Sequence, residues 1–118
     1  MKALQSDGHG LLLGSDAPQI FNVPGFSIHH EMEYMLNAGL SPLEIIQSGT
    51  INVAEYMEME DSFGEVKEGL SADLMLVTAN PLDDIAALKE LSGVFMKGHW
   101  ISREFIDNKL QEIAANAN

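Results

Sequence analysis

The stretch Leu11-Leu12-Leu13-Gly14-Ser15-Asp16-Ala17-Pro18 decides the fold prediction for this chain. Periodicity alone cannot assign a run of three leucines to a strand or to a helix. The glycine after the leucines and the later proline favour a buried strand that stops here. Such a strand delivers one carboxylate, that of Asp16, to the rim of a sheet or barrel. We therefore predict a strand over 11–13 and take Asp16 as the main candidate site residue.

Helical signals follow this stretch. Residues 28–38 are predicted to form a helix, because Met32, Met35 and Leu36 fall on one face. Gly39 is expected to end that helix as its C-cap.

The next segment, Ser41-Pro42-Leu43-Glu44, has the pattern of a helix start. Its serine can cap the helix, its proline suits the first helical position, and its glutamate lies three residues after the cap. We expect this helix to reach about Ser48 or Thr50. Asn52 is then expected to cap another short helix that ends near Met57.

The second half of the chain is predicted to contain short strands and a terminal helix. Strand composition and turn signals support these assignments. The expected elements are a weaker strand over 63–66, a stronger strand over 74–77, a short helix or turn over 85–91, a hairpin over 94–101 that turns near Lys97-Gly98, and a helix capped by Ser102.

Composition excludes several classes of partner and site. The 118 residues carry 18 acidic and 6 basic side chains, and the net charge of −12 argues against nucleic acid or an anionic membrane as a partner. The absence of cysteine excludes disulfides, thiolate metal sites and a cysteine nucleophile. No apolar stretch approaches the roughly 18 residues that a membrane span needs, and no signal peptide is recognisable. We expect a cytoplasmic protein.

An ordered series of short motifs runs from about residue 11 to about residue 101. The motifs are Gly14-Ser15-Asp16, His30-Glu31-Met32-Glu33, Ala38-Gly39-Leu40-Ser41-Pro42-Leu43-Glu44, Thr50-Ile51-Asn52, Gly64-Glu65-Val66, Gly69-Leu70-Ser71-Ala72-Asp73-Leu74, Asn80-Pro81-Leu82-Asp83-Asp84-Ile85 and Gly98. In order and spacing, this series resembles the C-terminal part of the metal-dependent amidohydrolase superfamily, and in particular its imidazolonepropionase-like and Xaa-Pro-dipeptidase-like members.

The resemblance implies an α+β fragment with three parts. Residues 1–58 would be the last strand and helices of a (β/α)8 metal-dependent hydrolase barrel. Residues 59–101 would form part of a small composite β-sandwich, and residues 102–118 a C-terminal helix.

The resemblance also implies an activity, namely hydrolysis of a carbon–nitrogen bond other than an ordinary internal peptide bond. A cyclic amide or a dipeptide-type small molecule would be the substrate. A divalent metal, with zinc the first choice, would activate the water. Asp16 would be a ligand of that metal and would pass the proton to the leaving amine. On local sequence alone, Asp16 can equally be a residue that merely caps a turn.

His29 and His30 are the second candidates, because the resemblance implies that this segment lies at the mouth of the active site, where a histidine would bind substrate. The alternative is a solvated helix start, in which His29 and Glu33 share a face. The pattern lacks the second histidine of His-Glu-x-x-His, so it does not support that class of zinc site.

Most of the family's metal ligands have no counterpart in this sequence. The resemblance places them on earlier strands, as a His-x-His pair, a modified lysine or an acid, and two further histidines. The ten residues before Leu11 contain no His-x-His. We therefore expect a C-terminal fragment that is inactive alone, and the sequence leaves open whether the chain is itself an enzyme. The alternative is an inert, truncated module that self-associates into a homo-oligomer through an exposed strand edge and apolar helix faces.

Overall fold

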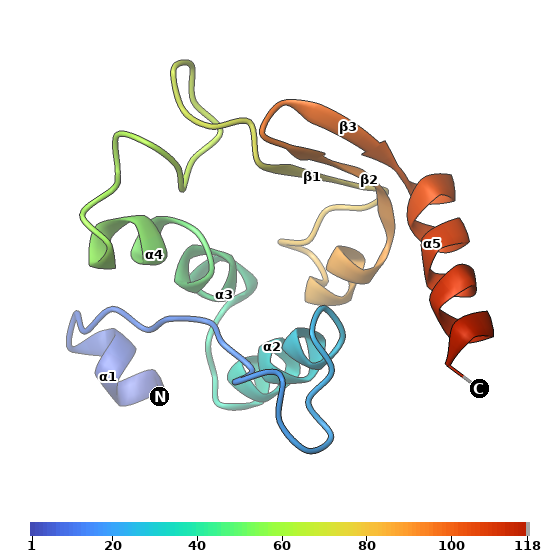
Figure 1. Cartoon of the computed structure of the whole chain (residues 1–118). Coiled ribbons are helices and arrows are strands. Elements are labelled where there is room, and N and C mark those ends of the chain that lie inside the picture. The colour runs from blue at the N-terminus through green and yellow to red at the C-terminus, as the bar shows by residue number, and fades with distance from the viewer. Residues whose placement is uncertain (118) are drawn as a thin grey trace.

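The computed structural model describes residues 1–117, and it shows an α+β chain. Four helices occupy the first half, and a three-stranded antiparallel sheet in the order β1-β2-β3 occupies the second. A final helix extends from the end of the sheet, away from the first four (Figure 1). The elements are α1 (Lys2–Ser6), α2 (Ser27–Asn37), α3 (Pro42–Ser48), α4 (Ile51–Tyr56), β1 (Leu74–Val77), the 3-10 helix η1 (Ile85–Lys89), β2 (Leu91–Met96), β3 (His99–Ser102) and α5 (Arg103–Asn116).

The α+β prediction is confirmed, and so are most of the predicted elements. The predicted domain boundaries near residues 58 and 101 stay predictions. Within residues 1–117, none of the helices combines the length and the apolar composition that crossing a bilayer demands.

The end of α2 lies one position earlier than predicted, and the expected glycine follows the C-cap. Ala38 is the C-cap, and Gly39 follows it with a φ of +93°, a backbone conformation that glycine adopts without steric cost. The N–H of Gly39 donates to the carbonyl of Leu36, and the N–H of Leu40 donates to that of Met35. These two bonds form a Schellman motif and bring Leu40 back onto the core.

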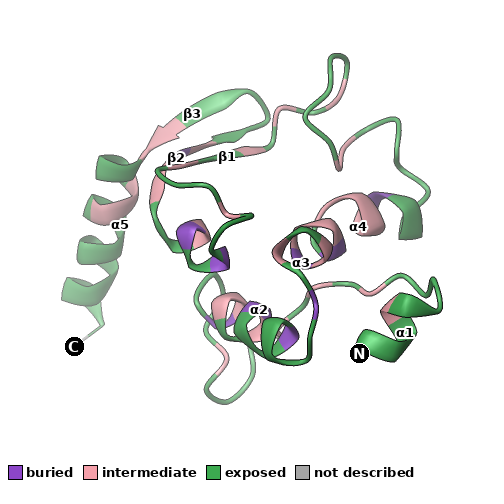
Figure 2. Cartoon of the chain, turned by 180° about the vertical axis from the view of Figure 1, so that it is seen from behind, coloured by how far each residue is buried: buried purple, intermediate pink, exposed green. Residues whose placement is uncertain are grey.

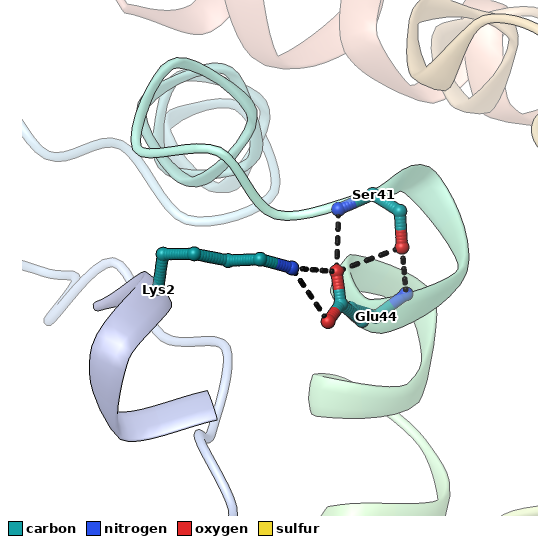
Figure 3. Close-up of polar contacts among 3 residues, drawn as sticks. All are labelled: Lys2, Ser41 and Glu44. Atoms are coloured by element: carbon teal, nitrogen blue, oxygen red, sulfur yellow. Dashed lines mark hydrogen bonds and ion pairs between the residues drawn. The ribbon is translucent and has the colours of Figure 1, made fainter. Parts of the chain in front are cut away.

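The capping box of α3 is confirmed and also fixes the N-terminal helix. The Ser41 Oγ accepts from the N–H of Glu44 at 3.3 Å, and the Ser41 N–H donates to Glu44 Oε2 at 2.7 Å. The Nζ of Lys2, on α1, donates to both carboxylate oxygens of Glu44 at 2.9 Å (Figure 3). The Ser41 N–H is the main reason that the pKa of Glu44 falls to about 2, and the Lys2 ammonium and the Ser41 hydroxyl lower it further.

This contact predicts acid sensitivity. Because the folded state lowers the pKa of Glu44 from 4.5 to about 2, its contribution to stability is present above pH 4.5 and is lost as the pH falls towards 2. The unfolding midpoint of the wild type should therefore drop more between pH 5 and pH 2.5 than that of Glu44→Gln. Thermal melts by circular dichroism at each pH measure the difference, with Glu60→Gln as the control. Parallel pH curves for the wild type and Glu44→Gln would contradict the prediction.

The predicted strand over 11–13 is wrong, although the segment does alternate as a strand would. Leu11 and Leu13 pack against the core, whereas Leu12 is exposed. The Leu13 N–H donates to the carbonyl of Ser48 at 2.9 Å. A strand needs a neighbouring strand for its backbone groups, and within residues 1–117 no strand pairs with this segment, whose partner here is α3.

Two further local predictions are wrong. Asn52 does not cap α4, since Thr50 is the N-cap, and its side-chain amide instead donates to the carbonyl of Leu11 at 2.9 Å. Residues 63–66 form bends, not a strand. A Cβ on Gly64 would lie only 2.8 Å from that of Ala54, so glycine allows this segment to approach α4 closely.

The hairpin between β2 and β3 is confirmed, with its turn where it was predicted. Lys97 and Gly98 both have a positive φ, as the tightest hairpin turns require. Gly93 on β2 lies opposite Ser102, and a Cβ there would lie 2.4 Å from the Trp100 ring. The ring therefore occupies the space that a side chain at position 93 would need.

The core lies among α2, α3 and η1, as Figure 2 shows by burial. An exposed ion pair of 2.6 Å between Lys89 Nζ and Glu33 Oε1 connects η1 to α2 beside this core. By contrast, α5 contributes no buried residue to the structure. The buried apolar cluster consists of Met32, Met35, Leu40, Ile45 and Ile85.

Candidate functional site

Asp16 lies in an exposed loop segment at the end of the leucine segment, and residues 14–17 are called the Asp16 turn below. Its φ of +54° is left-handed, a conformation that aspartate tolerates better than most residues. The side-chain amide of Asn22 donates to the carbonyl of Ser15 at 2.9 Å, and the Gln19 side-chain amide donates to Asp16 Oδ2. The carboxylate is therefore exposed, while hydrogen bonds hold both the Asp16 side chain and the backbone just before it.

The same turn is attached to the start of α2. Ser27, the first residue of α2, is buried and donates its hydroxyl to that of Ser15 at 3.0 Å. His29 and His30 follow within the first turn of this helix. The structure thus brings the Asp16 turn to the end of α2 that carries both histidines. Among the hydrogen bonds and ion pairs of residues 1–117, none joins Asp16 to either histidine.

The two histidines differ in their surroundings. His30 is exposed, whereas His29 is half-buried. Burial lowers the pKa of His29 below 6.5, and the nearby Lys89 ammonium lowers it further. The neutral imidazole is therefore favoured at pH 7, and it carries one hydrogen-bond donor and one acceptor. His29 is suited to contact a polar, uncharged group of a small molecule.

The residues of this chain do not form a complete metal site by themselves. A zinc site uses three or more protein ligands in a fixed geometry. Within the described range 1–117, no three His, Cys, Asp or Glu side chains lie close enough together to hold a metal ion. Asp16 offers one carboxylate, so further ligands would have to come from outside this range.

Two shallow cavities lie elsewhere on the surface. One, of about 170 Å³, is bounded by the loop 65–72 and Leu74, and the other, of about 260 Å³, lies between Trp100 and Phe105. Neither is lined by Asp16, His29 or His30.

Sequence reasoning missed Gln19 and Asn22, which contact the Asp16 turn directly. Neither residue belongs to a motif that the sequence analysis identified. Their roles depend on the loop folding back on itself, through a 2.9 Å bond from the Asn22 N–H to the Gln19 carbonyl. The spacing of residues in catalytic motifs does not predict that this loop folds back on itself.

Comparisons with known proteins agree on one family. The family model described as "Amidohydrolase family" matches residues 1–101. Adenine deaminase 1 from Latilactobacillus sakei subsp. sakei (strain 23K) is 31% identical over 77 residues, which cover 65% of this chain. A solved structure from Bifidobacterium longum, described as a prolidase, is 34% identical over 93% of the chain with a TM-score of 0.73. An Xaa-Pro dipeptidase with bound methionine in its active site is 32% identical over 64% of the chain, with a TM-score of 0.60.

The chain spans a small part of each of these proteins. It covers 12% of the adenine deaminase, 29% of the Bifidobacterium longum protein and 18% of the Xaa-Pro dipeptidase.

Proposed function

Because this chain belongs to the amidohydrolase family, we propose that it supplies one part of the active site of a hydrolase that cleaves carbon–nitrogen bonds in small molecules. The observation that carries the proposal is the position of Asp16. Its carboxylate is exposed on a held turn at the end of the leucine segment, within the matched residues 1–101. Residues 1–58 would complete a hydrolase barrel, and residues 59–101 would belong to a small β-sandwich.

Asp16 is proposed to move the proton in this reaction. An ionised carboxylate can accept a proton from the attacking water and deliver it to the leaving nitrogen. The proposal includes a divalent metal, with zinc the first choice, that Asp16 would help to hold. Its other ligands would be supplied from outside residues 1–117, so the chemistry proposed for this chain is proton transfer at Asp16 alone.

The proposed substrates are dipeptides that end in proline, or cyclic amides. The structural likeness to an Xaa-Pro dipeptidase and to a protein described as a prolidase favours the dipeptides. His29 and His30, at the start of α2, are proposed to contact the substrate beside Asp16. The neutral imidazole of His29 could donate a hydrogen bond to a substrate carbonyl or accept one from an N–H group.

The exposed apolar side chains of the sheet and α5 favour a second candidate function, that of an inert module that associates with a second copy of itself. Met75, Trp100 and Phe105 are 54%, 46% and 53% exposed. Exposed apolar surface of this kind favours association. Sedimentation of the purified chain measures this directly, and a monomer across the micromolar range would contradict it.

The hydrolase proposal can be tested with a chimera, in which this chain replaces the matching 29% of the Bifidobacterium longum relative. We expect the chimera to hydrolyse a proline-terminated dipeptide, and the 118-residue chain alone not to do so at the same concentration. The relative without the replaced segment is the control. Hydrolysis by the lone chain would contradict the incomplete site. A folded, zinc-loaded chimera that cleaves neither dipeptides nor cyclic amides would contradict the proposed function.

A further inference from the structure

Two amide side chains hold the Asp16 turn through separate hydrogen bonds. Gln19 Nε2 donates to the carboxylate oxygen Oδ2 of Asp16, and Asn22 Nδ2 donates to the carbonyl of Ser15, the residue before it, at 2.9 Å. The two amide residues are themselves joined, since the Asn22 N–H donates to the Gln19 carbonyl at 2.9 Å. One short loop thus contacts both the carbonyl that precedes Asp16 and the side chain of Asp16.

We propose that Gln19 and Asn22 are positioning residues for the Asp16 carboxylate, an inference that rests on the proposed function of Asp16. Asn22 fixes the peptide unit between Ser15 and Asp16, and with it the backbone direction from which the side chain leaves. Gln19 holds the side chain of Asp16 in one χ1 rotamer through its bond to Oδ2. Oδ2 then accepts from the amide, while Oδ1 accepts no hydrogen bond within residues 1–117 and is the oxygen proposed to take part in the reaction.

The base of this loop is held by a buried serine, which supports the positioning. Ser27 is only 7% exposed, and its hydroxyl contacts both the Ser15 hydroxyl and the carbonyl of Val23 at 3.0 Å. These contacts tie the two ends of the loop to the first turn of α2. Orientation matters because a small displacement of a catalytic group can cost about 100-fold in rate.

Because Gln19 is exposed, its replacement can change the orientation of Asp16 without changing the stability of the chain. Gln19 and Asp16 are both exposed, and neither belongs to the buried apolar cluster. Surface substitutions of this kind usually change stability little. Loss of the Gln19 amide should therefore release the Asp16 side chain without unfolding the chain, a result that a merely structural residue would not give.

Nuclear magnetic resonance of the full 118-residue chain tests the positioning directly. Three-bond couplings to Asp16 Cγ report its χ1 rotamer. We expect a single rotamer in the wild type and averaged couplings in Gln19→Ala and in Gln19→Glu, whose carboxylate repels that of Asp16. The unfolding midpoint should not change. Gln111→Ala, an exposed glutamine on α5, is the matched control. A fixed Asp16 rotamer in both Gln19 variants would overturn the proposal.

Kinetics of the chimera supply the second readout. Gln19→Ala should lower kcat by about 10- to 100-fold with KM unchanged. An unchanged kcat would overturn the positioning role even if the rotamer is released. The failure of the proposed function looks different: Asp16→Asn would then leave hydrolysis intact, whatever the couplings show about the orientation of the side chain.

Discussion

Replacement of Asp16 by asparagine should lower the kcat of the chimera by about 100- to 10,000-fold, the range that a positioned acid–base group contributes. Asparagine is nearly isosteric with aspartate and can still accept the hydrogen bond from Gln19. It cannot take up a proton at neutral pH, so the variant removes the chemistry and keeps the shape. Steady-state kinetics on a proline-terminated dipeptide measure the effect.

The matched control for this variant is Asp7→Asn. Asp7 is also an exposed aspartate, and it lies in the turn that follows α1. Its kcat should stay within about twofold of that of the parent chimera, because surface changes away from a site have small effects. Equal losses in the two variants would show that the negative charge of the chain matters and not the carboxylate at position 16.

Replacement of Ile45 by alanine is expected to lower the free energy of unfolding by about 2–5 kcal/mol, as in other cores where a large aliphatic side chain is truncated. Ile45 has no exposed surface and sits in the cluster with Met35 and Leu40. Because small domains are stable by only about 5–15 kcal/mol, this variant should unfold at a much lower urea concentration. Urea titration followed by circular dichroism measures the loss.

Leu43→Ala, on the same helix, is the matched control, because it makes a similar change in helix propensity at an exposed position. Leu43 is 51% exposed, so its truncation removes less buried surface and leaves no closed cavity. We expect a loss below about 1 kcal/mol. If Leu43→Ala and Ile45→Ala destabilise the chain equally, the core does not lie where the structure places it.

The helix starts and the hairpin turn that were predicted correctly depend on contacts between residues close together in the chain. The capping box of Ser41 and Glu44 closes within one helical turn, and Ser102 caps α5 in the same manner by accepting from the N–H of Phe105. Such signals can be recognised before the rest of the fold is known. The hairpin turn at Lys97-Gly98 belongs to this class.

The wrong predictions depend on contacts between distant residues. Leu11–Leu13 has the alternation of a strand, yet its backbone partner is Ser48 at the end of α3. Asn52, 41 positions after Leu11, bonds to the carbonyl of Leu11 and does not cap its own helix. Composition within a short window carries no information about which segment returns to satisfy a backbone group.

The candidate site likewise contains one residue that the sequence could indicate and two that it could not. Asp16 became a candidate through the exit of the leucine segment together with the family resemblance, and in the structure it is exposed and not buried in a core. The amides of Gln19 and Asn22 could not be identified, because their contacts exist only once the loop has folded back onto α2. The role of Asp16 in hydrolysis stays a prediction.

The central claim is that Asp16 belongs to a metal-dependent active site that this chain completes. The most direct test is a crystal structure of the chimera grown with zinc, in which the distance from the Asp16 carboxylate to the metal is measured. We predict one carboxylate oxygen at about 2.0–2.2 Å, the usual zinc–carboxylate distance. A zinc ion bound by other residues, with the Asp16 side chain in contact with neither the metal nor its bound water, would contradict the account.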